Sequence, residues 1–114
     1  MKFTTKQINE LITGIQLAAE LPAADTDYRR FITIIGGTKD KTINSGKLNT
    51  TVFCVRDYEV KRIVIEDDLD DSDSDYRNKT EIMVVGIEEL HNYLIYRITD
   101  FSAFVPIWES DATL

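Results

Sequence analysis

The residues with the plainest chemistry lie in one short segment, EDDLDDSDSD, at positions 66–75. Seven of these ten side chains are carboxylates, whereas the other 104 residues carry thirteen. A group of carboxylates attracts cations, either a metal ion or the basic side chains of another protein. Neighbouring like charges repel by just under ~1 kcal/mol even in water, so this segment cannot be packed inside a core. We therefore predict an exposed acidic loop at about 66–79.

An extended acidic loop can imitate a nucleic acid. At ~3.3 Å per residue the segment would present roughly one carboxylate every 5 Å, and a nucleic-acid strand carries one phosphate per ~3.4 Å. The loop can therefore occupy a basic groove that another protein uses for DNA or RNA. Two aromatic residues are expected at the surface, where they would anchor an interface rimmed by charge. The residues predicted to bind the partner are Glu66, Asp67, Asp68, Asp70, Asp71, Asp73, Asp75, Tyr76 and Trp108.

Two other interpretations of the acidic segment stay open. It can be a solvated linker whose charge only keeps the protein soluble. It can also bind a divalent metal, because Asp71, Asp73 and Asp75 alternate as the first ligands of an EF-hand loop do. The rest of that motif is missing, since Tyr76 occupies the position that needs glycine and Ile82 the position that needs glutamate. The three aspartates are therefore the alternative metal ligands, in a metal-binding module or a small enzyme.

The chain offers little else for catalysis. Cys54, its single cysteine, lies in the apolar run TVFCV, where a thiolate is disfavoured. Glu88 precedes the single histidine, His91, by three residues, but a di-iron site needs a second pair of this kind and the sequence has none. The run GGTKDKT lacks the glycine that directly precedes the lysine of a P-loop. We therefore expect neither an enzyme nor a cofactor.

Charge is divided unevenly along the chain. Residues 1–57 carry eight basic and six acidic side chains, a net +2, and residues 58–114 carry five and fourteen, a net −9, which gives the total of −7. This excess disfavours nucleic acids and anionic membranes as direct partners. No apolar run reaches the ~20 residues of a membrane span, and no signal peptide is recognisable. We expect a cytoplasmic protein whose partner is a protein with a basic surface.

The spacing of apolar residues predicts seven elements in one domain, 1–114. Helices are expected at about 5–20 and 87–97, and strands at about 29–35, 48–56, 59–66, 80–85 and 103–108. A polar loop is expected at 36–46 and a turn at 56–59. The order indicates an α+β fold, with an antiparallel sheet of about five strands and both the N-terminal and the C-terminal helix packed on one face.

The first helix has the clearest signals. Thr4 is placed to cap it, and Gln7 completes a capping box. Its apolar stripe continues to Ala19, and Pro22 would end it. Gly14 costs up to ~1 kcal/mol in a helix interior, which suggests that a neighbouring backbone passes close there.

In size, acidity and lack of catalytic residues the chain resembles the small acidic α+β proteins that bacteriophages and other mobile elements encode against host defence enzymes, including anti-restriction and anti-CRISPR proteins. It is also similar to the immunity proteins with which bacteria block toxin nucleases. The resemblance implies an inhibitor that binds a nucleic-acid-handling protein, without assigning a role to any single residue. A homo-oligomer is also compatible with the sequence, because the sheet can continue into a second subunit.

Overall fold

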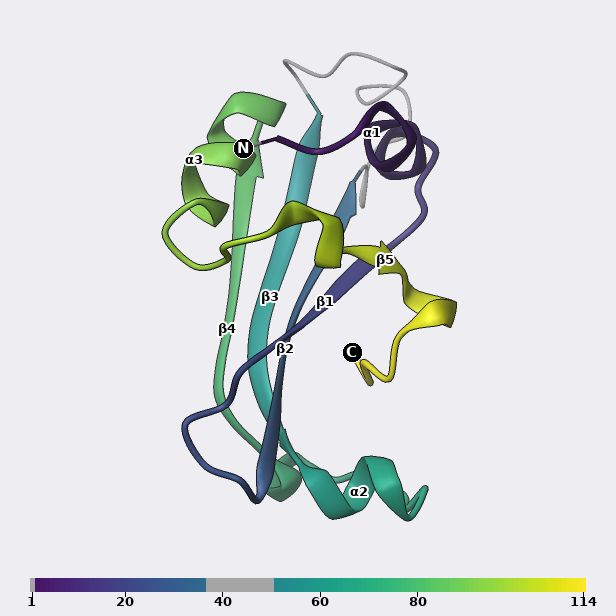
Figure 1. Cartoon of the computed structure of the whole chain (residues 1–114), viewed down its shortest axis with the longest axis vertical. Helices are drawn as coiled ribbons and strands as arrows, with labels where there is room; N and C mark the ends of the chain where they lie inside the picture. The colour runs from purple at the N-terminus through teal and green to yellow at the C-terminus, as the bar shows by residue number, and fades with distance from the viewer. Residues whose placement is uncertain (1, 37–50) are drawn as a thin grey trace.

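Five antiparallel strands form one sheet in the order β4-β3-β2-β1-β5 (Figure 1). The computed structural model describes residues 2–36 and 51–114. The sheet and its helices confirm the predicted α+β fold class. Residues 37–46 of the predicted loop and 48–50 of the predicted second strand lie outside the described residues.

Among the described residues the helices are short, β2, β3 and β4 are the longest strands, and there are also three single turns of 3-10 helix. The helices are α1 (Thr5–Ile12), α2 (Arg62–Glu66) and α3 (Ile87–Leu94). The strands are β1 (Leu17–Leu21), β2 (Tyr28–Gly36), β3 (Val52–Lys61), β4 (Tyr76–Val85) and β5 (Val105–Pro106). The 3-10 turns are η1 (Asp73–Asp75), η2 (Phe101–Ala103) and η3 (Ile107–Glu109).

One face of the sheet packs against α1, α3 and η2, and we call it the helix face. This confirms the prediction that the N-terminal and C-terminal helices share a face. The buried residues of this main core are Phe3, Leu11, Leu17, Ala19, Ile32, Ile34, Phe53, Val55, Ile87, Leu90, Leu94, Ile98, Phe101 and Phe104.

Gln7 is a buried polar residue that fixes α1 to this core. Its side-chain oxygen accepts a hydrogen bond from the Thr4 N–H at 2.8 Å, and the Thr4 hydroxyl accepts one from the Gln7 N–H, so the predicted capping box is confirmed. Its side-chain nitrogen donates to the carbonyls of Phe101 (2.8 Å) and Phe104 (3.0 Å). All the polar atoms of this side chain are thereby satisfied, as burial requires.

The opposite face, which we call the tail face, is covered at one end by α2 and by residues 110–114. A second, smaller core lies here, made of Phe31, Tyr58, Val60 and Val64, with Ile65, Tyr76, Ala112 and Leu114 packed against it. The hydroxyl of Tyr58 accepts hydrogen bonds from the backbone N–H groups of Thr113 (3.0 Å) and Leu114 (3.1 Å). The last residues of the chain therefore complete a core.

The prediction of a helix over 5–20 was wrong in its second half. α1 ends at Ile12 because Gly14 adopts a left-handed conformation, with φ +88°. The Ile15 N–H bonds to the Glu10 carbonyl (2.9 Å) and the Gly14 N–H to the Leu11 carbonyl (3.2 Å), the pattern of a Schellman motif. No described atom lies within 4 Å of a Cβ placed on Gly14, so the backbone conformation, and not a close neighbour, explains this glycine.

After Gly14 the chain enters β1, which pairs antiparallel with β2. Leu17 and Ala19 point into the main core, as alternate residues of a strand do. Pro22 therefore follows a strand rather than a helix.

The turn predicted at 56–59 was also wrong, because β3 continues through these residues. An irregularity in its pairing with β4 lies there: two steps along β3, from Asp57 to Glu59, are matched by three along β4, from Thr80 to Arg77. Asn78, with φ +52°, lies within the longer stretch. This is a β-bulge in β4.

The strand predicted at 59–66 ends at Lys61 and is followed by α2. β2 begins at Tyr28, opposite Lys61, and β4 begins at Tyr76, opposite Val60. A longer β3 would have no neighbouring strand in the described sheet, so its backbone groups would lack partners. One turn of helix satisfies them locally instead, in spite of the β-branched run in RIVIE.

The remaining elements differ from the prediction mainly in length. β4 begins four residues before the predicted start at 80, α3 ends at Leu94 rather than at 97, and β5 is shorter than the predicted 103–108. Pro106 has no N–H to extend the ladder, and η2 and η3 flank the two residues of β5.

We predict that Gly14→Ala lowers the free energy of unfolding by about 1 kcal/mol, because alanine is disfavoured at positive φ. Gly14→Asn should cost less, because asparagine tolerates the left-handed region better. Denaturant unfolding of the wild type and both variants measures the effect. An alanine variant as stable as the wild type would contradict this account of the helix end.

Candidate protein-binding surface

The acidic segment is not the single extended loop that the sequence predicted. Glu66 is the last residue of α2, residues 67 and 68 form a turn, residues 69–72 are irregular, and Asp73 and Asp75 lie in η1. β4 then begins at Tyr76, so the predicted loop region at 76–79 is strand. The carboxylates therefore belong to a compact projection, which runs from α2 to η1 at one end of the sheet (Figure 1).

The backbone of this projection is fixed by a second Schellman motif. Asp68 takes the left-handed position, with φ +50°. The Leu69 N–H bonds to the Val64 carbonyl (3.0 Å), and the Asp68 N–H to the Ile65 carbonyl (3.3 Å). The buried Val64 holds α2 on the tail-face core. The motif turns the chain sharply and leaves the side chains of 66–70 exposed.

Three of the seven predicted carboxylates have partners within the protein. Glu66 accepts a hydrogen bond from Arg62 at 3.1 Å, and Asp71 accepts one from the hydroxyl of Tyr76. Asp75 accepts one from the Ser72 N–H at 2.8 Å and lies 3.6 Å from the Lys61 ammonium. The bond from Ser72 is the main reason that the pKa of Asp75 is lowered.

The other four carboxylates are exposed and have no hydrogen bond or ion pair with any described residue. They are Asp67, Asp68, Asp70 and Asp73, and we call them the acidic patch. They are the least neutralised part of the segment. Because no described residue supplies a cation to them, we take their charge as available to a partner.

Two large apolar side chains lie beside the acidic patch. Ile63 is 55% exposed and Leu69 is 50% exposed. Each lines a hollow that borders α2. One hollow, of about 500 Å³, is lined by Asp27, Tyr28, Lys61, Arg62, Ile63, Glu66 and Asp67. The other, of about 340 Å³, is lined by Val64, Ile65, Asp68, Leu69, Asp71, Asp111 and Thr113.

Of the two predicted aromatic anchors, one is at the surface. Trp108 is 68% exposed in η3, but no described contact joins it to the acidic patch. Tyr76 is half-buried instead. Its ring packs edge-on against Tyr58 with centroids 5.7 Å apart, and its hydroxyl is shared between Asp71 and the Thr113 hydroxyl (2.9 Å). The apolar residue beside the charges is Leu69, which lies inside the acidic run and is not among the residues predicted from sequence to bind the partner.

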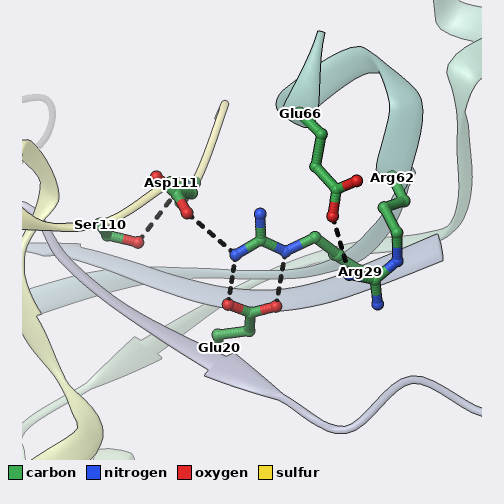
Figure 2. Close-up of polar contacts among 7 residues, drawn as sticks. Glu20, Arg29, Arg62, Glu66, Ser110 and Asp111 are labelled. Carbon is green, nitrogen blue, oxygen red and sulfur yellow. Dashed lines mark hydrogen bonds and ion pairs between the residues drawn. The ribbon is translucent and has the colours of Figure 1, made fainter. Parts of the chain in front are cut away.

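Residues 110–114, which we call the tail, border the acidic patch and are held by an arginine of β2. Figure 2 shows Arg29 between Glu20 of β1 and Asp111 of the tail. Its guanidinium forms two bonds to Glu20, at 2.6 and 2.7 Å, and one to Asp111 at 3.0 Å. The bonds to Glu20 are the main cause of the raised pKa of Arg29. Figure 2 also shows the Arg62–Glu66 pair on α2.

The metal-binding alternative needs several ligand side chains gathered around one point. The described residues contain no group of three or more His, Cys, Asp or Glu arranged to hold a metal ion. Asp71 and Asp75 instead face Tyr76 and Ser72, respectively.

Cys54 and His91 do not form a catalytic pair. Cys54 is buried, and it alternates with Phe53 and Val55, which point to the helix face. His91 lies in α3 on that helix face, where its Nε2 accepts a hydrogen bond from the Phe3 N–H at 3.3 Å. Burial lowers the pKa of His91, which favours the neutral ring that this bond needs.

A second group of charged residues lies on the helix face, at the end that carries the bulge. Arg30 holds Asp57 with two bonds, at 3.0 and 2.6 Å. The buried Glu59 accepts from Asn78 (2.5 Å) and Arg77 (3.2 Å), and the bond from Asn78 is the main reason that the pKa of Glu59 is lowered. These charges compensate one another, so the group stabilises the sheet.

Sequence reasoning missed this group because residues 56–59 were predicted to form a turn. The available signal was alternation, since Asp57 and Glu59 continue the period of Val55 along one face of a strand. A hollow of about 480 Å³ lies beside the group, lined by Pro22, Ala23, Ala24, Arg30, Asp57, Glu59, Asn78 and Thr80.

A scan against protein-family models, a search of curated proteins and a search of solved structures each found no match to this chain. Within residues 2–36 and 51–114, no helix has both the length and the apolar composition needed to cross a membrane.

We predict that Tyr76→Phe lowers the free energy of unfolding by about 1–2 kcal/mol at neutral pH, because two hydrogen bonds of a half-buried hydroxyl are lost. Burial, with a smaller contribution from Asp71, raises the pKa of Tyr76 to about 12, above the ordinary value of 10. The folded state then keeps the phenol protonated where the unfolded state ionises it. The stabilisation of the folded state by the Tyr76 hydroxyl is therefore complete below pH 10 and is lost as the pH rises toward 12.

The difference in stability between wild type and Tyr76→Phe should therefore shrink between pH 10 and 12. Denaturant unfolding across this range measures it, and Tyr96→Phe, at an exposed position, is the matched control. A difference that stays constant with pH would show that the hydroxyl is not held as described.

Proposed function

We propose that this protein binds a partner protein through the acidic patch and so blocks a nucleic-acid-handling enzyme. One observation carries the proposal: four exposed aspartates, which have no partner within residues 2–36 and 51–114, lie beside two exposed apolar side chains, Ile63 and Leu69. Residues 61–75 carry seven acidic and two basic side chains, a net −5 of the total −7. Such a surface attracts a cationic one.

Charge and apolar area have different roles in such an interface. Unscreened carboxylates steer the approach of a basic partner and raise the association rate, an effect that falls as salt increases. Apolar residues at the centre supply affinity when they enter a pocket of the partner, while surrounding charges exclude wrong partners. Leu69, between Asp68 and Asp70, is placed to act as this central residue.

The compact shape of the acidic projection favours one kind of binding site on the partner. A turn followed by one turn of 3-10 helix does not offer the regular spacing of an extended ribbon, so a point-by-point imitation of phosphates is not the basis of the proposal. The acidic projection suits a basic cleft into which it can insert. Enzymes that hold DNA or RNA have such clefts, and this includes both defence nucleases and toxin nucleases.

We predict that changing Asp67, Asp70 and Asp73 to Asn weakens capture of the partner by roughly tenfold, because the steering charge is removed. The control changes Glu10, Glu88 and Glu89 to Gln, which gives the same net charge of −4 from residues of α1 and α3. Pull-down from a bacterial lysate at low and high salt compares the three proteins. Equal capture by both variants, or capture that ignores salt, would rule out the acidic mechanism.

We also predict that Leu69→Ser weakens capture by roughly tenfold and changes the midpoint of thermal unfolding little, because half of the side chain is already exposed. Ile95→Ser removes an exposed apolar side chain near the end of α3 and should leave capture unchanged. If the two variants lose capture to the same extent, Leu69 is not the central contact.

A further inference from the structure

β4 is an edge strand, and it is long. It forms one margin of the sheet (Figure 1), while all but the residues at its bulge pair with β3 on the inner side. Among the described residues, no backbone hydrogen bond reaches its outer side. A strand edge of this length whose outer backbone groups have no described strand beside them is a template for a further strand.

The first part of this edge, around Asn78, has features that prevent pairing with another chain, and the part from Lys79 to Val85 is regular and apolar toward its end. The bulge at Asn78 interrupts the strand, and the adjacent Lys79 carries a charge. From Lys79 to Val85 the strand is regular. Met83 and Val85 are 46% and 56% exposed, and Ile82 and Val84 are only partly buried. A protein that has no use for such an edge usually blunts it.

We propose that two copies of this chain pair through residues 79–85 of β4, antiparallel, about a two-fold axis at Ile82. The two five-stranded sheets then form one continuous sheet of ten strands. A two-fold pair is the most common form of protein assembly, and it requires a surface that is complementary to itself.

The proposed register satisfies this requirement. It places Ile82 opposite itself, Thr80 opposite Val84, Glu81 opposite Met83, and Lys79 opposite Val85. Opposed residues of an antiparallel pair share a face, so this register covers every apolar residue of the stretch and opposes no like charges. It also leaves the bulge outside the pairing.

The register leaves in place the contact that joins Glu81 to the neighbouring strand. Glu81 keeps its bond to Arg56, at 2.7 Å, across the inner ladder. The other sheet edge is less suitable, because β5 has two residues. A second copy is thus the occupant that the β4 edge fits best, and the dimer does not depend on the acidic patch or its partner.

The test is the molar mass in solution, measured by light scattering and sedimentation over a range of protein concentrations. The wild type should approach twice the 13.1 kDa of one chain as its concentration rises. A wild type that stays monomeric throughout overturns the proposal.

Two substitutions at one exposed position test the register. Val85→Lys places two like-charge pairs against Lys79 of the other copy, whereas Val85→Glu places two opposite-charge pairs there. We expect the lysine variant to dimerise at least roughly tenfold more weakly than the glutamate variant. Circular dichroism confirms that both are folded. Equal dimerisation of the two variants overturns the proposed pairing.

Discussion

The point at which β3 loses its neighbouring strands determines where the acidic surface lies and what shape it has. Both neighbours of β3 begin opposite its last two residues, so the chain beyond Lys61 has no ladder to join. Backbone groups that leave a sheet must find partners, and here a single helical turn provides them. The sharp end of that turn, with Asp68 in a left-handed conformation, then turns the chain back toward β4 within ten residues. A segment that turns this sharply within ten residues cannot bury its carboxylates, so they are exposed to solvent.

Two tyrosines and one arginine fix the base of this projection. Tyr58 accepts hydrogen bonds from the backbone N–H groups of Thr113 and Leu114, and Tyr76 donates one to Asp71, two residues before η1 begins. Arg29 joins the tail to β1 through Asp111 and Glu20. Segments far apart in sequence therefore meet on the tail face. A surface fixed in advance loses less conformational freedom on binding, which favours recognition by a rigid partner.

The fold class and the start of the first helix could be predicted from sequence because their signals are local. Thr4 and Gln7 cap α1 as the capping-box pattern predicts. The end of α1 could not be predicted in the same way, because the apolar residues around Ala18 fit both the helical period and strand alternation. Only Gly14 distinguished them, and its role depends on a backbone angle.

Other differences arise from tertiary pairing. Residues 56–59 have the composition of a turn, yet two neighbouring strands hold them in β3. Residues 62–66 have strand propensity, yet none of the described strands lies beside them. Seven acidic residues were identified from sequence, but which of them have partners depends on Arg62, Tyr76 and Ser72, whose positions the sequence alone does not give.

The acidic patch and the proposed dimer are electrostatically compatible. Pairing about Ile82 places the two copies of Tyr76 at opposite ends of the shared strands, about 40 Å apart at ~3.3 Å per residue. That separation is several times the Debye length of ~8 Å at physiological salt, so the two patches would repel each other little. A dimer would also present two acidic projections facing away from each other. An oligomeric enzyme with two basic clefts could then bind both projections of one dimer. Once the first projection is bound, the second binds at a high effective concentration.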